Sequence, residues 1–365
     1  MTAVSEPPPG GRKPSPAKPR RGRSLLLNLA LVLTAFGLLA LAIYQNRAPL
    51  RDVLSNRIDF RLFGLAVAIY LSTLVLTFLR WFALVRVIEP RFRVRDALLL
   101  GFIGNVFNLV IPGAVGGDFI KAAFLVRMDI NRTQAVASMV IDRILGLLGL
   151  FLLASVAGAF AWPMAPPRVR ILIALAWAAV AAGLMVLASI FNQSLTKRFP
   201  KLLEGDGKAA KILRELRVMS ITYRGRLDLI AGLLLGSAGL HSLFVSAFYL
   251  ASLAIFPMKL PGLAQHLLIV PLILFTTAVP LPFGALGLTE QVSAELFRLV
   301  NHPVGAVAMM AFRVLMYTGG FVSALVYLTR VKQVRALTET AEGLEHELLD
   351  AGPGKPPLPT NDPPR

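Results

Sequence analysis

The sequence contains no cysteine, and this absence excludes disulfides, thiol nucleophiles and cysteine metal sites. Its four histidines lie at scattered positions that form no metal-ligand pattern. No phosphate-binding loop of the nucleotide-hydrolysing type is present, so we expect no ATP hydrolysis by this chain. We therefore expect no cofactor and no metal, and we assign no catalytic residue.

Acidic residues are scarce relative to basic ones, 20 against 38, which gives a formal net charge of +18. Such a charge can indicate nucleic-acid binding. Here the basic residues gather beside apolar stretches, as is typical of the cytoplasmic side of membrane proteins. We therefore predict membrane lipids as partners, no nucleic acid, and lipid-synthesis enzymes as further candidates; the oligomeric state is not indicated.

Apolar residues are abundant, at 56% of 365 residues, with a mean hydropathy of +0.67. This content predicts an all-α polytopic membrane protein. The apolar stretches are 25–44, 62–79, 96–111, 133–160, 169–191, 227–255, 263–279 and 304–328. Because nearly all apolar residues lie in them, we predict one membrane domain over 25–330, with about six full spans.

The charged connections predict the orientation. The N-terminal tail of residues 1–24, the connection 80–95 and the loop 192–226 are strongly basic, and we expect all three to be cytoplasmic. The connection 46–61 is also basic and is accepted as an exception. Both tails, 1–24 and 331–365, are expected to be cytoplasmic and largely disordered, in a multi-pass protein of a bacterial inner (plasma) membrane.

The loop 192–226 contains an amphipathic stretch with one apolar and one basic face. Its apolar face has Ala209, Ile212, Leu213, Leu216, Met219 and Tyr223. This helix could lie on the anionic inner leaflet, or it could pack on the cytoplasmic surface of the protein itself.

Two segments, 96–131 and 263–300, are too short to cross twice. Their limbs rise about 20 to 25 Å, against a hydrocarbon thickness of roughly 30 Å. We predict that each is a re-entrant helical hairpin and that the two enter from opposite sides. Each half of the chain, about 25–160 and 169–328, then has two spans, a hairpin and a third span, which is an inverted-topology repeat.

A motif that occurs twice marks the hairpin tips. It reads Gly-Ala-Val-Gly-Gly-Asp at 113–118 and Gly-Ala-Leu-Gly-Leu-Thr-Glu at 284–290, and each copy follows a proline. Arg143 and Arg313 follow the two copies at about 30 and 29 residues, near the middle of a span. Helix breaks and charges inside a membrane are costly and usually mark function.

A helix that restarts inside the membrane points its free N–H groups toward the midplane, where they favour an anion such as phosphate. We expect Asp118 to pair with Arg143 and Glu290 with Arg313, and we predict that these four and Lys121 form one central polar site. The full predicted substrate-binding set is Asn108, Gly113, Gly116, Gly117, Asp118, Lys121, Asp142, Arg143, Gly284, Gly287, Glu290 and Arg313. Alternatively, the acids only cap their helices and the arginines only fix helix packing.

Three runs carry a resemblance to a known family. They are Asn-Leu-Val-Ile-Pro-Gly-Ala-Val-Gly-Gly-Asp at 108–118, Ser-Met-Val-Ile-Asp-Arg-Ile-Leu-Gly at 138–146, and Pro-Phe-Gly-Ala-Leu-Gly-Leu-Thr-Glu at 282–290. Together they resemble the lysylphosphatidylglycerol synthase transmembrane, or flippase-like, family over about 25–330. The resemblance implies movement of aminoacylated phospholipids between leaflets, or a place in hopanoid or isoprenoid-linked lipid pathways. It points to the same tips and to Asp142 and Arg143.

Full-length synthases of this kind carry a soluble aminoacyl-transferase domain, whereas only 35 residues follow Arg330. We therefore do not expect lysyl transfer. The leading hypothesis is a lipid flippase or transporter for a phosphate-bearing lipid. The alternatives are a membrane enzyme that transfers a group to or from a polyprenyl, hopanoid or phospholipid substrate, with a buried acid as base, and an accessory scaffold for lipid synthesis.

Overall fold

The computed structural model describes residues 21–55, 57–110, 116–192, 208–256, 260–279 and 281–331. Within these ranges the chain is helical and has no β-strand, which confirms the predicted all-α class. Residues 1–20 and 332–365 of the predicted tails lie outside the described ranges. Helix α1 (Arg21–Gln45) begins inside the segment predicted as tail.

Five helical segments in the described ranges are long and apolar enough to cross a membrane. Four of them are α3 (Phe60–Ile88), α6 (Arg132–Ala161) with η1 (Trp162–Met164), α7 (Pro167–Phe191) and α15 (Gly305–Leu328). The fifth segment, Leu216–Ile255, contains the end of α10 (Lys208–Tyr223), η2 (Arg224–Arg226) and α11 (Leu227–Ile255). Helix α1 and the short α2 (Arg47–Ser55), bent by 76° at their junction, bring the number to six when the pair is counted as one span. The multi-pass architecture therefore follows the apolar stretches of the sequence.

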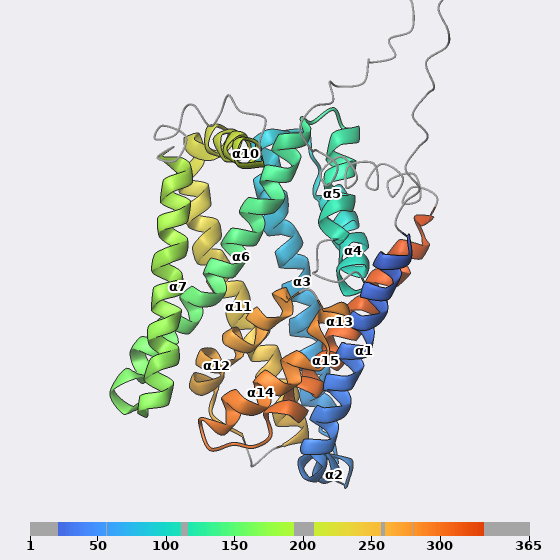
Figure 1. Cartoon of the computed structure of the whole chain (residues 1–365), viewed down its shortest axis with the longest axis vertical. Helices are drawn as coiled ribbons and strands as arrows, with labels where there is room; N and C mark the ends of the chain where they lie inside the picture. Colours follow the sequence, from blue (N-terminus) through green and yellow to red (C-terminus); the bar gives the residue numbers. More distant parts are fainter. Residues whose placement is uncertain are drawn as a thin grey trace, which may run out of the picture.

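The first hairpin consists of α4 (Val94–Val110) and α5 (Gly116–Arg127), side by side in the upper half of Figure 1. Its tip, 111–115, lies outside the described residues. The limbs approach closely because Gly117 has no side chain: a Cβ there would lie 2.2 Å from the carbonyl oxygen of Gly104. The limbs have 17 and 12 residues. They rise about 26 and 18 Å, less than the roughly 30 Å of a bilayer core.

The second hairpin lies in the lower half of Figure 1 and is more irregular. It consists of α12 (Leu263–Phe275), η3 (Thr276–Ala278), α13 (Pro282–Ala285) and α14 (Leu288–Arg298). At its tip the backbone turns through left-handed φ values, 57° at Phe283, 66° at Gly284, 53° at Ala285 and 84° at Gly287. Glycine tolerates this conformation, which explains two of the glycines in the motif.

The helices of the two halves exchange partners. Helices α3 and α11 pack along each other, α4 packs on α15, and α12 packs on α6. Aromatic rings join these helices in the core, with Phe312 lying 5.7 Å from Tyr70 and 5.2 Å from Phe248 between ring centroids. Each hairpin thus lies against the third span of the other half. Such an exchange is expected of an inverted repeat, which stays a prediction.

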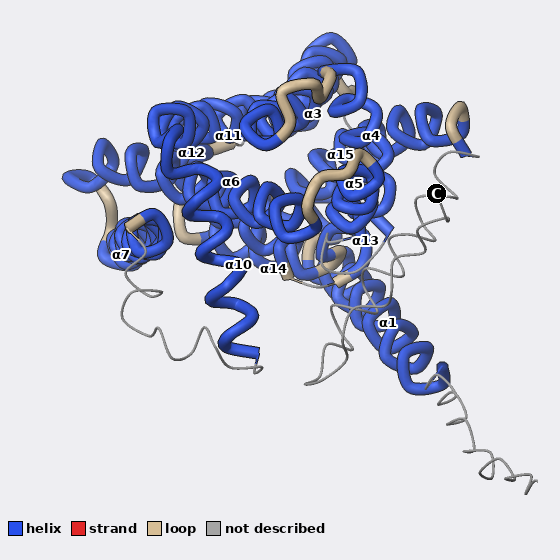
Figure 2. The backbone as a smooth tube through the Cα atoms, turned by 90° about the horizontal axis from the view of Figure 1, so that it is seen from above, coloured by secondary structure: helices blue, strands red, loops and turns tan. Residues whose placement is uncertain are grey.

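Helix α1 lies at the edge of the bundle, as Figure 2 shows from above. It packs mainly on α13 and α14 of the second hairpin. Gly287 permits this contact, because a Cβ there would lie 2.4 Å from the Cβ of Leu38. The tip of the second hairpin is therefore held partly by the first helix of the chain.

Two expectations about the connections change. Arg80 was expected in the connection 80–95, but α3 continues to Ile88, so Arg80 lies inside a span with its side chain only 9% exposed. An ion pair compensates its charge there.

The amphipathic stretch forms α10, and Met219 and Tyr223 of its apolar face are buried against Leu84 and Ile141. This contact agrees with packing on the protein itself; residues 193–207 of the loop lie outside the described ranges.

Candidate functional site

The first hairpin presents a cluster of charges that we call the Asp118 group: Asp118, Lys121 and Arg143. Nε of Arg143, on α6, lies 2.5 Å from Oδ2 of Asp118, on α5. Nζ of Lys121, one turn along α5, lies 3.8 Å from Oδ1 of the same carboxylate. Lys121 also lies over the ring of Trp81, 4.9 Å from its centroid, which is a favourable cation–π contact. The predicted pairing of Asp118 with Arg143 is present.

The Asp118 group is partly accessible and has an excess of positive charge. The side chain of Arg143 is 41% exposed, against 16% for Asp118 and 10% for Lys121. Two cations here share one carboxylate. A partly exposed guanidinium with a second cation beside the same carboxylate is a suitable receptor for a phosphate or carboxylate.

Backbone groups at the start of α5 complete this region. Gly116 and Gly117 form its first, buried turn, and the N–H of Gly117 donates to the side-chain oxygen of Asn108, 2.8 Å away. Asn105, on the same helix as Asn108, donates to Ser323 of α15, 3.0 Å away. Gly113 lies outside the described residues. Asn108 therefore accepts a hydrogen bond from a backbone donor at the helix break.

The second hairpin presents the Glu290 group: Thr289, Glu290 and Arg313. Nε of Arg313, on α15, lies 2.5 Å from Oε1 of Glu290. Its two terminal nitrogens donate to the carbonyl oxygen of Phe283, at 2.6 Å, and to the hydroxyl of Thr289, at 2.5 Å. The second predicted pairing, Glu290 with Arg313, is present, and Arg313 also fixes the backbone of the tip.

The Glu290 group is closed and electrically balanced. Glu290 is fully buried, and the side chain of Arg313 is 5% exposed. The other carboxylate oxygen, Oε2, accepts from the N–H of Gly287 at 2.7 Å and from the hydroxyl of Thr289 at 3.0 Å. Glu290 thus caps its helix and also pairs with Arg313. The two alternatives given for it from the sequence, a helix cap and a partner of the arginine, are both present.

The described hydrogen bonds among the five predicted central residues lie within one group or the other. The Asp118 group joins α5 to α6, and the Glu290 group joins α14 to α15. The residues thus form two equivalent groups with different exposure, and the predicted single central site stays a prediction. The doubled motif in the sequence predicts that the two groups are equivalent. It does not predict their different exposure, because the exposure of each group depends on which helices cover its tip.

Asp142, which the resemblance places in the predicted substrate-binding set, forms an ion pair with Arg80. Its carboxylate accepts from Nε of Arg80 at 2.8 Å, and Arg80 also donates to Ser237 of α11 at 3.0 Å. His241, on α11, lies 2.9 Å from the carbonyl oxygen of Gly146, on α6, and so joins these two helices. This network ties α3, α6 and α11 together. Sequence reasoning missed Arg80, although the apolar run that resumes after it, at 81–85, was a usable signal.

An apolar groove beside the second tip reaches Arg313. We call it the α1–α15 groove; its volume is about 600 Å³. Its lining residues are Phe36, Leu39, Ile43, Phe283, Leu286, Met310, Arg313, Val314 and Tyr317. Arg313 is the one charged residue among them. The groove therefore offers apolar walls next to a buried cation, the pattern expected for an amphipathic molecule.

Comparison with known families gives an extensive match. The family model described as "Lysylphosphatidylglycerol synthase TM region" matches residues 25–324. A comparison with curated proteins gives no significant match.

Proposed function

The chain belongs to the lysylphosphatidylglycerol synthase transmembrane family, and on this premise we propose that it moves a phosphate-bearing lipid across the inner membrane of a bacterium. The family indicates lipid metabolism or transport. The finer assignment rests on the residues at the two tips and on the apolar surface beside them.

The observation that carries the proposal is the difference between the two groups. Arg143 is accessible and lies with Lys121 beside a single carboxylate, whereas Arg313 is sealed and balanced by Glu290. A phosphate diester carries one negative charge and fits the excess positive charge of the Asp118 group. The headgroup would bind there first, and its phosphate oxygens would accept hydrogen bonds from Arg143 and Lys121 in competition with the present partners of these two side chains.

The groove beside Arg313 supports a lipid rather than a free ion. An apolar chain can lie against Phe36, Leu39 and Val314 without leaving a hydrophobic environment. A phosphate at Arg313 would compete with Glu290 and with the carbonyl oxygen of Phe283, because both accept from this guanidinium. Opening of the Glu290 group would then accompany arrival of the headgroup, and closing would return Glu290 to its partner.

Transport follows if the groups are exposed in turn. The Asp118 group is open in this conformation and the Glu290 group is closed, as one end state of an alternating cycle requires. The second state would have the reverse exposure. A bound phosphate shifts the balance only if it binds the two states with different affinity.

A deletion strain tests the proposal in cells. We expect one phosphate-bearing lipid to accumulate in the inner leaflet, with its chemical structure unchanged, and the wild-type chain to restore its distribution. The Arg143→Gln variant should fail to restore it, whereas Arg127→Gln, which changes an exposed arginine at the far end of α5, should succeed. An unchanged distribution would refute transport, and a chemically altered lipid would favour the enzyme alternative.

A further inference from the structure

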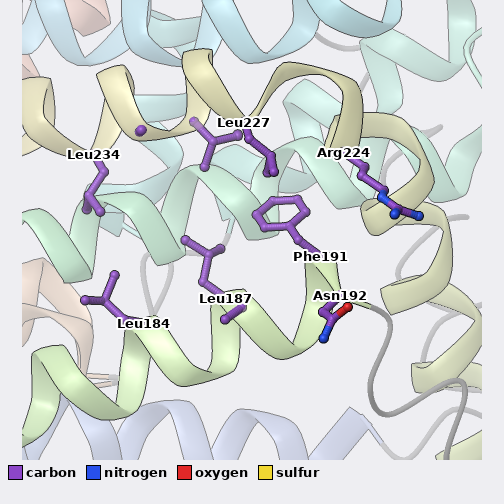
Figure 3. Close-up of a pocket in the computed structure, with 10 residues that line it drawn as sticks. Leu184, Leu187, Phe191, Asn192, Arg224, Leu227 and Leu234 are labelled. Carbon is purple, nitrogen blue, oxygen red and sulfur yellow. The ribbon is translucent and has the colours of Figure 1, made fainter.

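A second groove lies away from both hairpins, between α7 and α11 (Figure 3). We call it the α7–α11 groove; its volume is about 640 Å³. Its walls are apolar and include Leu184, Leu187, Phe191, Leu227, Ala231 and Leu234. None of its lining residues comes from α4, α5, α12 or α14. The groove is therefore separate from the proposed transport site.

One end of this groove is polar. Arg224, from η2, and Asn192, at the end of α7, lie at the same end in Figure 3, while Leu184 and Leu234 lie at the other. The polar end adjoins α10, on the side predicted to be cytoplasmic. The groove thus has apolar walls along the span and a cation at the level where α7 ends.

The charge of this end is positive and incompletely balanced. Arg226 lies 3.6 Å from Asp228, whereas no described ion pair involves Arg224. Arg217 and Arg214 of the neighbouring α10 are also exposed. Cytoplasmic leaflets are rich in anionic lipids, and basic residues at the membrane surface attract them.

We propose that the α7–α11 groove binds an anionic phospholipid that is not transported. Its acyl chain lies along Leu187 and Leu234, and its phosphate accepts hydrogen bonds from Arg224 and the amide of Asn192. Apolar burial alone would admit any lipid, so the guanidinium provides the preference for an anionic headgroup. The bound lipid bridges α7 to η2 and so braces the junction of α10 with the bundle.

Photolabelling of the full chain in nanodiscs tests the proposal. The probes are phosphatidylglycerol and phosphatidylcholine that carry a diazirine in one acyl chain, and the labelled peptides are mapped by mass spectrometry. We expect phosphatidylglycerol to label 184–191 and 227–234 preferentially. Arg224→Gln should reduce that labelling about tenfold, the worth of one charge-assisted hydrogen bond.

Two further variants make the result decisive. Arg226→Gln removes a charge two residues away, outside the groove, and should keep the preference. Ala231→Phe places a ring in the groove and should reduce labelling by both probes. Equal labelling by the two lipids, or wild-type labelling in Arg224→Gln, would overturn the proposal. Thermal unfolding of each variant confirms that the fold is intact, since Arg224 and Ala231 are exposed.

Discussion

At the scale of single residues, the two arginines that follow the tips show how alike sequences can have unlike surroundings. Their spacing from the motif correctly predicts their carboxylate partners, because a helix brings each arginine back to the depth of its tip. Spacing does not predict that Arg313 is sealed and Arg143 open. Helix α1 packs against the second tip, a contact between distant parts of the sequence that the spacing does not show.

The closed pair should matter for stability. Arg313→Ala leaves the carboxylate of Glu290 buried without its cation, and we expect a loss of about 3 to 5 kcal/mol in unfolding free energy. Arg298→Ala breaks an exposed pair with Glu295 and should cost less than about 1 kcal/mol. Thermal unfolding in detergent measures both.

A double variant separates charge from packing at this position. Replacing both partners, as in Glu290→Gln with Arg313→Met, removes the uncompensated charge and should recover part of the stability. If Arg313→Ala were as stable as the wild type, the Glu290 group would not be the structural anchor of the tip.

At the scale of elements, the short limbs of the hairpins are predictable from length, because 11 to 17 helical residues cannot cross a bilayer. The tip geometry is only partly predictable. Glycine and proline indicate a break, but the contact of Gly287 with α1 joins residues that are far apart in the sequence. Arg80 shows the opposite case. Its charge suggested that the helix ends there, but the helix continues, and the ion pair with the distant residue Asp142 stabilises Arg80 inside the span.

The contact between α1 and the second tip gives a prediction. Gly287→Ala would place a Cβ 2.4 Å from Leu38 at a φ of 84°, so α1 must move away. We expect a loss of about 1 to 3 kcal/mol in stability. Gly236→Ala, in open space on α11, should be neutral or stabilising by up to about 1 kcal/mol.

Crosslinking reports the same movement directly. The rings of Phe36 and Phe283 lie 5.9 Å apart between α1 and the tip, and the chain has no native cysteine. A Phe36→Cys, Phe283→Cys pair should therefore crosslink efficiently with a short thiol reagent, and adding Gly287→Ala should lower the yield. An unchanged yield would mean that α1 tolerates the extra atom in place.

At the scale of the whole molecule, the helical class and the spans follow from composition, whereas the two grooves do not. Grooves depend on how distant helices are spaced, and hydrophobic periodicity carries no information on that spacing. The orientation in the membrane is the largest prediction that still rests on charge alone.

Single cysteines test the opposed orientation of the hairpins. Arg127 and Arg298 lie in the last turns of α5 and α14, at the open ends of the two hairpins. Arg298→Cys should react with a membrane-impermeant maleimide in spheroplasts, and Arg127→Cys only after the membrane is permeabilised. Labelling of both from the same side would exclude the inverted arrangement.

The most direct measurement of the central claim is lipid exchange between leaflets of vesicles that contain the purified chain. The probes are acyl-NBD forms of phosphatidylglycerol, phosphatidylethanolamine and a polyprenyl phosphate, with NBD-glucosylceramide as the phosphate-free control, and dithionite reports the outer leaflet. We predict faster exchange of at least one phosphate-bearing probe but not of the control, and a loss of about tenfold or more in rate for Arg143→Gln but not Arg127→Gln. Exchange no faster than in protein-free vesicles, or equal rates for wild type and Arg143→Gln, would contradict the account.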